Sequence, residues 1–334
     1  MRIANVSFGC SFCSGVVFVA GFLCASAGFA SDKKTEAHLL QHGSQKIVEP
    51  LVPQISYQGD ANSLSFLMLG DYGEGNADQK SVAALLEKVC QLANPSAIFG
   101  LGDNIYPKGV RSADDSQWKA KFEDIYSAAC TKSKPWIAVL GNHDYVGNPD
   151  GEVDYARKNK QWVMPARTYV VHYGPLLDIF AADSNVESKC AAPDCGFGEL
   201  QKQATVSSAA WKIVLAHHPL FSVGEHKEPP NGLAEKLIPL YCAAKMDFFF
   251  VGHDHNLQHN QGKFLNSSCE INEFVVGGGG AQLYPVEPAP GITRFAQKEF
   301  GFALVKFEKT TATFSYYSVK NGMQPVYTVV VKKP

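Results

Sequence analysis

The sequence predicts an α/β protein built as a four-layer α-β-β-α sandwich, in which two mixed sheets lie inside and helices lie outside. Two observations predict this fold. Short apolar runs alternate with segments of helical periodicity, and strand-like runs dominate the middle and C-terminal parts of the chain. The 334 residues, of which 46% are hydrophobic and 19% are charged, are enough for a large core. We expect one domain over residues 61–334.

The first half of the predicted domain alternates strands and helices. Residues 64–69 form an apolar run that stops at Gly70-Asp71, which is typical of a buried strand. The segment from Gln79 to Gln91 carries apolar residues at helical spacing. The other elements expected in this half are strands over residues 97–101 and 135–140 and a helix over residues 116–129.

The rest of the predicted domain is richer in strands. Residues 211–216 and 246–251 are further apolar runs, and residues 167–184 and 301–331 contain strand-like stretches. Within the last segment, two runs flank a polar turn, which favours an antiparallel hairpin over residues 303–317.

The first 60 residues differ in composition from the predicted domain. Arg2 is the only charged residue before Asp32, and an apolar run is followed there by small residues. This layout is typical of a secretory signal peptide, which we assign to residues 1–30, so we expect a secreted or periplasmic protein. The alternative is an uncleaved N-terminal membrane anchor, because the uncharged stretch is long enough to span a bilayer. Residues 31–60 are polar, and we expect a surface arm or linker there.

The cysteines favour disulfide bonds. Nine cysteines occur, of which three lie in the predicted signal peptide, and an even number in an exported chain favours pairing. Cys190 and Cys195 flank a short loop and are the pair that we expect first. Buried free thiols are the alternative for the others. One of the many pairings that would complete the set is Cys90–Cys130 with Cys242–Cys269.

Polar motifs follow the carboxyl ends of five predicted strands. In open α/β sheets the ligand crevice lies beyond these ends, so the motifs can converge at one site. Their carboxylates, amide, imidazoles and phenol suit a pair of metal ions better than one structural zinc ion. A dinuclear centre of this kind activates water for attack on phosphorus. The motifs are Gly70-Asp71, Gly102-Asp103 with Tyr106, Gly141-Asn142-His143, His217-His218 and Gly252-His253-Asp254-His255.

This set resembles the purple acid phosphatases within the calcineurin-like metallophosphoesterases, and in particular their short, tartrate-resistant type. The resemblance runs from about Phe66 to the C-terminus. It implies an acid phosphatase that hydrolyses phosphate monoesters. The strings that carry it are Leu-Gly-Asp-Asn-Ile-Tyr at 101–106, Lys-Phe-Glu-Asp-Ile-Tyr at 121–126, Ser-Val-Gly-Glu-His at 222–226 and Val-Gly-His-Asp-His-Asn-Leu-Gln at 251–258.

The resemblance implies that seven ligands are divided between a ferric ion and a divalent ion, with Asp103 bridging both. The donor types agree, because a phenolate is a hard anionic ligand for Fe(III), whereas imidazoles and an amide suit a divalent ion. Tyr106 distinguishes a centre that contains Fe(III) from a centre of two divalent ions, since metallophosphoesterases without this phenol tend to hold two divalent ions. The ferric ion would be held by Asp71, Tyr106 and His255, and the divalent Fe, Zn or Mn ion by Asn142, His217 and His253.

The resemblance also implies two histidines that act on the substrate. Hydroxide generated by the metal ions would attack phosphorus in line. His143 would hydrogen-bond the phosphate, and His226 would do the same or protonate the leaving alkoxide. His218 stands where the family carries an aromatic residue, and no role follows for it. Asp144 and Asp254 are expected to orient backbone groups or ligand imidazoles.

Three functions compete at this point. The first is the exported acid phosphatase with an Fe(III)–M(II) centre. The second is a phosphodiesterase or nucleotidase of the same superfamily that uses two divalent ions, and the third is a secreted binding protein or a redox-active iron protein with vestigial hydrolysis. The chain has a net charge of −2, whereas a nucleic-acid-binding protein typically carries an excess of basic residues. We expect a small phosphorylated substrate or a phosphoprotein as partner, no nucleic acid, no stable membrane association after signal cleavage, and a monomer.

Overall fold

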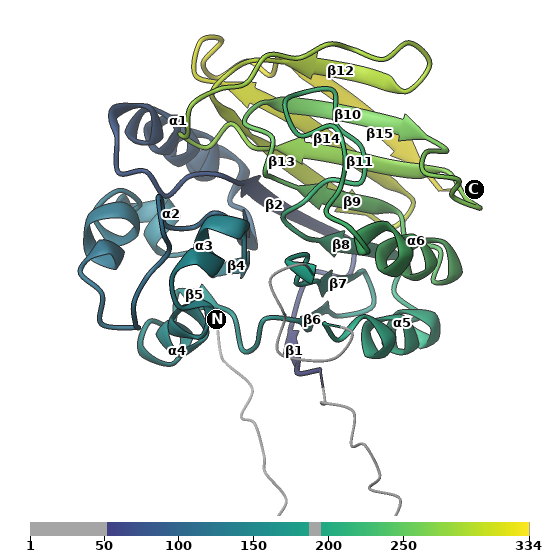
Figure 1. Cartoon of the computed structure of the whole chain (residues 1–334), viewed down its shortest axis with the longest axis horizontal. Coiled ribbons are helices and arrows are strands. Elements are labelled where there is room, and N and C mark those ends of the chain that lie inside the picture. The colour runs from purple at the N-terminus through teal and green to yellow at the C-terminus, as the bar shows by residue number, and fades with distance from the viewer. Residues whose placement is uncertain (1–51, 187–194, 334) are drawn as a thin grey trace, which may run out of the picture. The chain divides into compact units, whose positions relative to one another are not determined.

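Two mixed sheets form the centre of the fold, as predicted (Figure 1). This computed structural model describes residues 52–186 and 195–333. The predicted signal peptide at 1–30 lies outside the described residues. So does Cys190, and with it the pair that we expected first among the cysteines.

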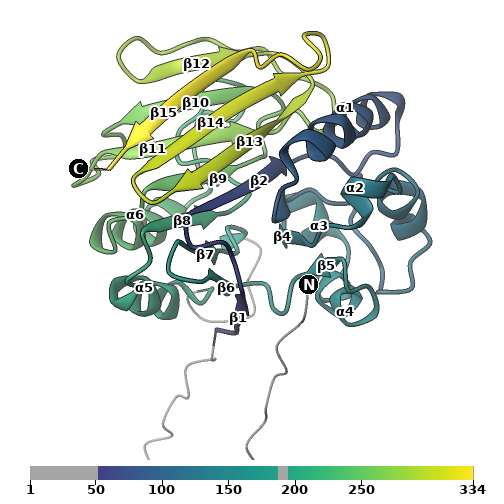
Figure 2. The ribbon, with the colours of Figure 1, turned by 180° about the vertical axis from the view of Figure 1, so that it is seen from behind.

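One sheet has seven strands and confirms the strands predicted in the first half and at the end of the domain. They are β2 (Ser63–Leu69), β3 (Ala97–Leu101), β4 (Trp136–Val139), β5 (Trp162–Val163), β13 (Gly301–Glu308), β14 (Thr311–Ser318) and β15 (Tyr327–Lys332). Their order across the sheet is β15-β14-β13-β2-β3-β4-β5. Strands β2 to β5 are parallel, and β13 joins β2 in antiparallel pairing. The predicted hairpin is β13-β14, in which Ala303 pairs with Tyr316. Figure 2 shows β13 to β15 in front of β10 to β12 of the other sheet.

The other sheet has eight strands in the order β1-β6-β7-β8-β9-β11-β10-β12. Strand β1 corrects one expectation, because it lies inside the segment 31–60 that we expected to be an arm, and it pairs in parallel with β6. Four residues are too few to show a periodicity in the sequence. The strands are β1 (Gln54–Tyr57), β6 (Tyr169–Tyr173), β7 (Leu177–Ala181), β8 (Trp211–Leu215), β9 (Phe248–Val251), β10 (Leu257–Gly262), β11 (Ile271–Val276) and β12 (Thr293–Gln297).

Aromatic side chains fill the space between the two sheets. Phe66 of β2 lies edge-on to Tyr173 of β6, with ring centroids 5.1 Å apart. Phe274 of β11 and Phe314 of β14 are 3.9 Å apart. Such pairs contribute about 0.5–1.5 kcal/mol beyond the burial of their area. The shared core therefore fixes one sheet relative to the other. It thereby also fixes the relative positions of the strand ends that carry the polar motifs.

Helices cover the outer faces of both sheets. Helix α1 (Ala77–Ala93) packs on β2 and β13, and α4 (Pro149–Lys158) packs on β5. Helices α5 (Phe197–Val206) and α6 (Leu233–Ala243) share a second core with the outward residues of the larger sheet. This order of helix, sheet, sheet and helix is the predicted sandwich. Within the described residues, the helices are too short or too polar to cross a membrane.

The helix expected over residues 116–129 is largely absent. A π-helical turn, η1 (Lys119–Glu123), is followed by irregular turns, and α2 begins only at Ala129 and ends at Lys132. Trp118, Phe122 and Tyr126 are all buried there. A wider turn keeps residues spaced four apart on one face, so packing of these rings overrides the α-helical pattern.

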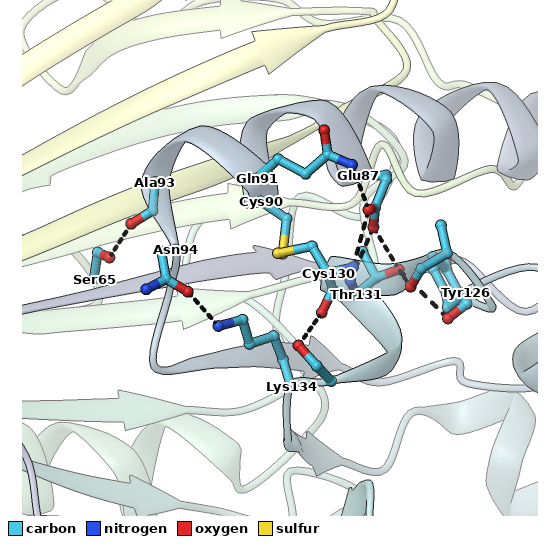
Figure 3. The surroundings of a disulfide bond; sticks show 12 residues. Ser65, Glu87, Cys90, Gln91, Ala93, Asn94, Tyr126, Cys130, Thr131 and Lys134 are labelled. Atoms are coloured by element: carbon cyan, nitrogen blue, oxygen red, sulfur yellow. Dashed lines mark hydrogen bonds between the residues drawn. A yellow bond between two sulfur atoms is a disulfide. The ribbon is translucent and has the colours of Figure 1, made fainter. Parts of the chain in front are cut away.

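Two disulfide bonds are present in the described residues, and both belong to the pairing considered above. Cys90–Cys130 joins α1 to α2, and Cys242–Cys269 joins α6 to the segment before β11. Figure 3 shows Glu87 beside the first bond, where its carboxylate accepts hydrogen bonds of 2.9 Å from two backbone amides at the start of α2. The carboxylate satisfies amides that a short helix leaves without partners.

Candidate metal centre

The predicted ligands meet where the carboxyl ends of strands from both sheets come together. The end of β2 touches the end of β9, since a Cβ on Gly70 would lie 3.0 Å from the Cα of Gly252. The Gly70 amide also donates to the Val276 carbonyl at 2.8 Å, which ties the two sheets at this edge. The strand-end prediction is therefore correct in placing distant motifs side by side.

Four of the predicted ligands form an oxygen-rich cluster: Asp71, Asp103, Tyr106 and His255. The Tyr106 Oη atom lies 3.1 Å from Asp71 Oδ1, 2.8 Å from Asp103 Oδ2 and 3.0 Å from His255 Nε2. His255 is oriented by its Nδ1, which lies 2.7 Å from the Gln282 carbonyl oxygen. A hydrogen bond to a carbonyl makes Nδ1 the donor and leaves the Nε2 lone pair pointing into the cluster.

The electrostatics of the oxygen-rich cluster call for a cation. Burial raises the pKa of Tyr106 well above its usual value, and the carboxylates of Asp71 and Asp103 raise it further. Burial lowers the pKa of His255, but its contact with Asp71 outweighs this and the pKa rises to about 8. A phenolate between two carboxylates needs a strong positive charge, which a bound metal ion supplies.

The remaining three predicted ligands form a nitrogen-rich cluster: Asn142, His217 and His253. The His217 Nε2 atom lies 3.1 Å from Asn142 Oδ1 and 3.2 Å from His253 Nδ1. His217 Nδ1 donates to the Leu101 carbonyl at 2.8 Å, so Nε2 presents a lone pair toward the amide oxygen of Asn142. Burial lowers the pKa of His253 well below its usual value, with help from His218 and His217. Neutral imidazoles whose lone pairs converge are the form that binds metal ions.

Asp103 connects the two clusters. Its Oδ2 atom contacts Tyr106 as given above, and its Oδ1 atom lies 3.5 Å from His217 Nε2. The ligand atoms of Asp71, Asp103 and His217 lie within 4.8 Å of one another. Donor atoms this close together can bind the same ion, because metal–ligand bonds are about 2.0–2.3 Å long. The residues present therefore fit two metal ions that share the Asp103 carboxylate.

The backbone at the site is strained. Asp71, Asp103 and His253 have φ angles of 59°, 51° and 66°, a region that side chains other than glycine rarely adopt. Such strain costs about 1–3 kcal/mol each and concentrates at functional sites. Glycines provide the space, because a Cβ on Gly141 would lie 2.1 Å from Asp103 Oδ1 and one on Gly252 would lie 2.6 Å from Asp71 Oδ2.

His143 and His226 flank the two clusters. The His143 ring is 4.4 Å from the Tyr106 ring, beside the oxygen-rich cluster, and its Nδ1 is 2.7 Å from the Pro107 carbonyl. The His226 ring is 4.1 Å from the His253 ring, beside the nitrogen-rich cluster. Both side chains are partly exposed, so each is accessible to a ligand that binds at the two clusters.

Buried carboxylates hold the backbone of the site. Asp144 accepts hydrogen bonds of 2.8–3.1 Å from the amides of Gly141, Asn104 and Ile105. Burial raises the pKa of Asp144 to about 6, and the nearby Asp103 contributes to that rise. Asp254 accepts from the amide of His226 at 3.3 Å. Both contacts agree with the expectation that these residues orient backbone groups.

Sequence reasoning missed two residues at the site. The Tyr284 ring stacks on His255 at 4.3 Å and lies edge-on to His226 at 5.5 Å. Ser184 Oγ contacts the imidazole of His218 at 2.8 Å. Tyr284 follows a glycine run with no periodicity, so the sequence carried no signal for it. Ser184 lies in the polar run Asp183-Ser184-Asn185 after β7, and nothing in that run singles out the serine.

Comparisons with known proteins agree with this geometry. The family of calcineurin-like phosphoesterases matches residues 64–257, and the C-terminal part of iron/zinc purple acid phosphatase-like proteins matches residues 273–325. Purple acid phosphatase 7 of Arabidopsis thaliana is 29% identical over 307 residues, which cover 84% of this chain and 90% of that protein. Tartrate-resistant acid phosphatase type 5 of Homo sapiens is 26% identical over 304 residues, which cover 80% of this chain and 90% of that protein.

Solved structures show the same fold. A purple acid phosphatase from yellow lupin seeds has a TM-score of 0.66 at 19% identity, covering 83% of this chain and 55% of that one. The anchor protein of the inner membrane complex of Plasmodium has a TM-score of 0.71 at 23% identity, covering 81% of this chain and 89% of that one. The first family match spans more than half of the chain and includes every predicted metal ligand. The chain therefore belongs to the calcineurin-like phosphoesterases and is homologous to the purple acid phosphatases.

Proposed function

We propose that this chain is an exported acid phosphatase that hydrolyses phosphate monoesters at a dinuclear centre of Fe(III) and divalent Fe, Zn or Mn. The observation that carries the proposal is the position of the Tyr106 phenol, at hydrogen-bond distance from Asp71, Asp103 and His255. A buried phenol in this company suits a hard trivalent cation. The neutral imidazoles of the nitrogen-rich cluster suit a divalent one.

The side chains divide the work around the bound phosphate. When bound, the two metal ions would lower the pKa of water and neutralise charge on the phosphoryl oxygens. Asp103 would be the carboxylate that the two ions share. His143 would bind the phosphate from the side of the oxygen-rich cluster. His226 would bind it from the opposite side or protonate the leaving alkoxide.

Two alternatives make different demands on the site. A phosphodiesterase or nucleotidase with two divalent ions would have no use for a phenol ligand, so the placement of Tyr106 favours the Fe(III) centre. A binding protein with the same fold, such as the Plasmodium anchor, would not need convergent ligands. Here all seven predicted ligands meet at one edge, which favours an enzyme.

Export is part of the proposal. Its support is the signal-like N-terminus, together with two disulfide bonds, which persist in oxidising compartments. We propose that the mature chain acts as a monomer on a small phosphorylated substrate or a phosphoprotein, without nucleic acid and without stable membrane association.

The test combines metal analysis, a visible spectrum and a paired hydrolysis assay on the purified mature protein. We expect one iron and one further iron, zinc or manganese ion per chain, a purple or pink absorption band, and faster hydrolysis of p-nitrophenyl phosphate than of bis(p-nitrophenyl) phosphate. A colourless protein with two divalent ions and a preference for the diester would support the second alternative instead. Metal binding without hydrolysis of either compound would support the binding protein.

A further inference from the structure

His218 is a third imidazole beside the nitrogen-rich cluster, and the proposed function leaves it without a role. Its ring lies 4.5 Å from the His253 ring and 4.9 Å from the His217 ring. One of its ring nitrogens lies within 4.8 Å of a ring nitrogen of each of these two histidines. The side chain is buried, with 4% of its surface exposed. An imidazole held this close to the metal ligands is either a ligand itself or a hydrogen-bonding group.

The contacts of Ser184 determine which nitrogen of His218 carries the proton. Ser184 Oγ accepts hydrogen bonds from the amides of His217 at 3.2 Å and of His218 at 3.1 Å. A hydroxyl oxygen has two lone pairs, so both are used and only its own proton remains. That proton points to His218 Nδ1, 2.8 Å away. His218 Nδ1 is therefore an acceptor, and in the neutral ring the proton sits on Nε2.

This tautomer excludes the possibility that His218 is itself a metal ligand. A metal ligand would need a lone pair on Nε2, which would move the proton to Nδ1 and leave Ser184 Oγ facing three donors. The described residues provide no hydrogen-bond partner for Nε2 of His218. A phosphoryl group presents only acceptor oxygens, whereas His217 and His255 present lone pairs to the metal sites. A fixed N–H donor beside them supplies what the phosphate lacks.

We propose that His218 Nε2–H donates a hydrogen bond to a phosphoryl oxygen of the substrate held at the nitrogen-rich cluster, with Ser184 fixing the tautomer. This inference rests on the proposed function, because its acceptor is a phosphate oxygen. It makes His218 a substrate-binding residue and Ser184 a positioning residue.

Two substitutions of His218 separate the donor from the Ser184 contact. His218→Asn keeps an oxygen acceptor near the place of Nδ1 and loses the donor, whereas His218→Gln places an amide N–H near the place of Nε2. With inorganic phosphate as the probe, we expect isothermal titration of the metal-loaded H218N protein to show binding weaker by roughly tenfold or more. H218Q should recover most of that loss, and both variants should retain two metal ions per chain. His172→Asn, at an imidazole outside the site, is the matched control and should bind phosphate like the wild type.

A long-range proton–nitrogen NMR spectrum tests the tautomer directly in the zinc-loaded wild-type protein, whose ions are diamagnetic. We expect the proton of His218 on Nε2, and a mixture of tautomers in Ser184→Ala. A proton on Nδ1, loss of a metal ion in H218N, or unchanged phosphate binding in H218N would each overturn the inference. If the wild type binds phosphate through His218 but hydrolyses no ester, the proposed function fails while this inference stands.

Discussion

The two ends of the candidate metal centre are built from different chemistry. The oxygen-rich cluster sets a phenol between two carboxylates, where burial and charge raise the pKa of Tyr106. The nitrogen-rich cluster sets imidazoles against each other and against an amide, where burial lowers the pKa of His253. One end therefore has an excess of negative charge, whereas the other is built from neutral groups apart from the shared Asp103. This difference in donor type is what the proposed division between a trivalent and a divalent ion depends on.

The two ends also differ in what holds their ligands. Asp71 and Asp103 sit on tight turns with positive φ, closed in by glycines. His217 is held instead by the Leu101 carbonyl at 2.8 Å and by the contact of its amide with Ser184. Variants at the first end should thus change charge and geometry together, whereas variants at the second should act through orientation.

The largest effect is expected where the two ends share a ligand. Asp103→Asn removes the negative charge that both clusters use, so we expect loss of both ions and of hydrolysis. Mutation of a residue that hydrogen-bonds a metal ligand lowers metal affinity or activity by about 10–100-fold. Mutation of a ligand that both ions share should lower them by more. Metal analysis and hydrolysis of p-nitrophenyl phosphate measure the two losses.

The control for this variant is Asp178→Asn. Asp178 is a buried carboxylate outside the site, and its Oδ1 atom lies 2.7 Å from His172 Nδ1. It should keep both ions. If Asp103→Asn kept full metal content and activity, the two clusters would not be joined through this residue.

A smaller but still severe effect is expected from the glycine beside the shared carboxylate. In Gly141→Ala the new methyl group would lie 2.1 Å from Asp103 Oδ1, so the carboxylate must move. Displacing a positioned group by about 1 Å can cost about 100-fold in rate. Gly262→Ala is the matched control, since its methyl group would meet Ile292 at an ordinary 3.6 Å. Equal kcat/KM values in the two variants would contradict a tight fit at Gly141.

Tyr106→Phe should affect only the oxygen-rich end. The ring stays but the three contacts of its hydroxyl are lost, so we expect loss of the visible band and weaker binding of iron, with the divalent ion retained. A visible spectrum with analysis of both metals measures this, and Tyr284→Phe, which stacks on His255, is the matched control. Loss of the divalent ion first, or retention of the colour, would break the proposed division between the two ends.

The ligands could be predicted from the sequence because each follows a pattern, whereas their supports could not. An apolar run ending in glycine and a polar residue marks a strand end, and Asp71, Asp103 and His253 all follow such runs. Ser184 and Glu273 act through contacts with a segment more than 30 residues away, and no local pattern encodes such a contact. The same limit explains β1, whose four residues are ordered by pairing with β6.

The smallest effect on chemistry, but a measurable one on stability, is expected from Glu273 of β11. Its buried carboxyl group accepts from the amides of Leu220 at 2.7 Å and Phe221 at 3.2 Å, and so holds the segment that follows His217. Burial raises its pKa from 4.5 to about 8, although these two amides lower it in part. The folded protein therefore keeps a proton that the unfolded chain has released. The stability from this group is fully present below pH 4.5 and is lost as the pH rises through about 8.

Glu273→Gln cannot titrate, so the difference in the free energy of unfolding between variant and wild type isolates this one group. We expect urea unfolding from pH 5 to pH 8 to shift that difference in favour of the variant by a few kcal/mol, and at most about 5 kcal/mol. The exposed Glu235→Gln on α6 should show no such trend. At pH 5, kcat/KM should stay within about twofold of the wild type, because the amide oxygen still accepts from one of the two backbone groups. Parallel stability curves would mean that the carboxylate stays ionised in the fold. The hydrogen bonds from the amides of Leu220 and Phe221, and not a proton, would then compensate for its burial.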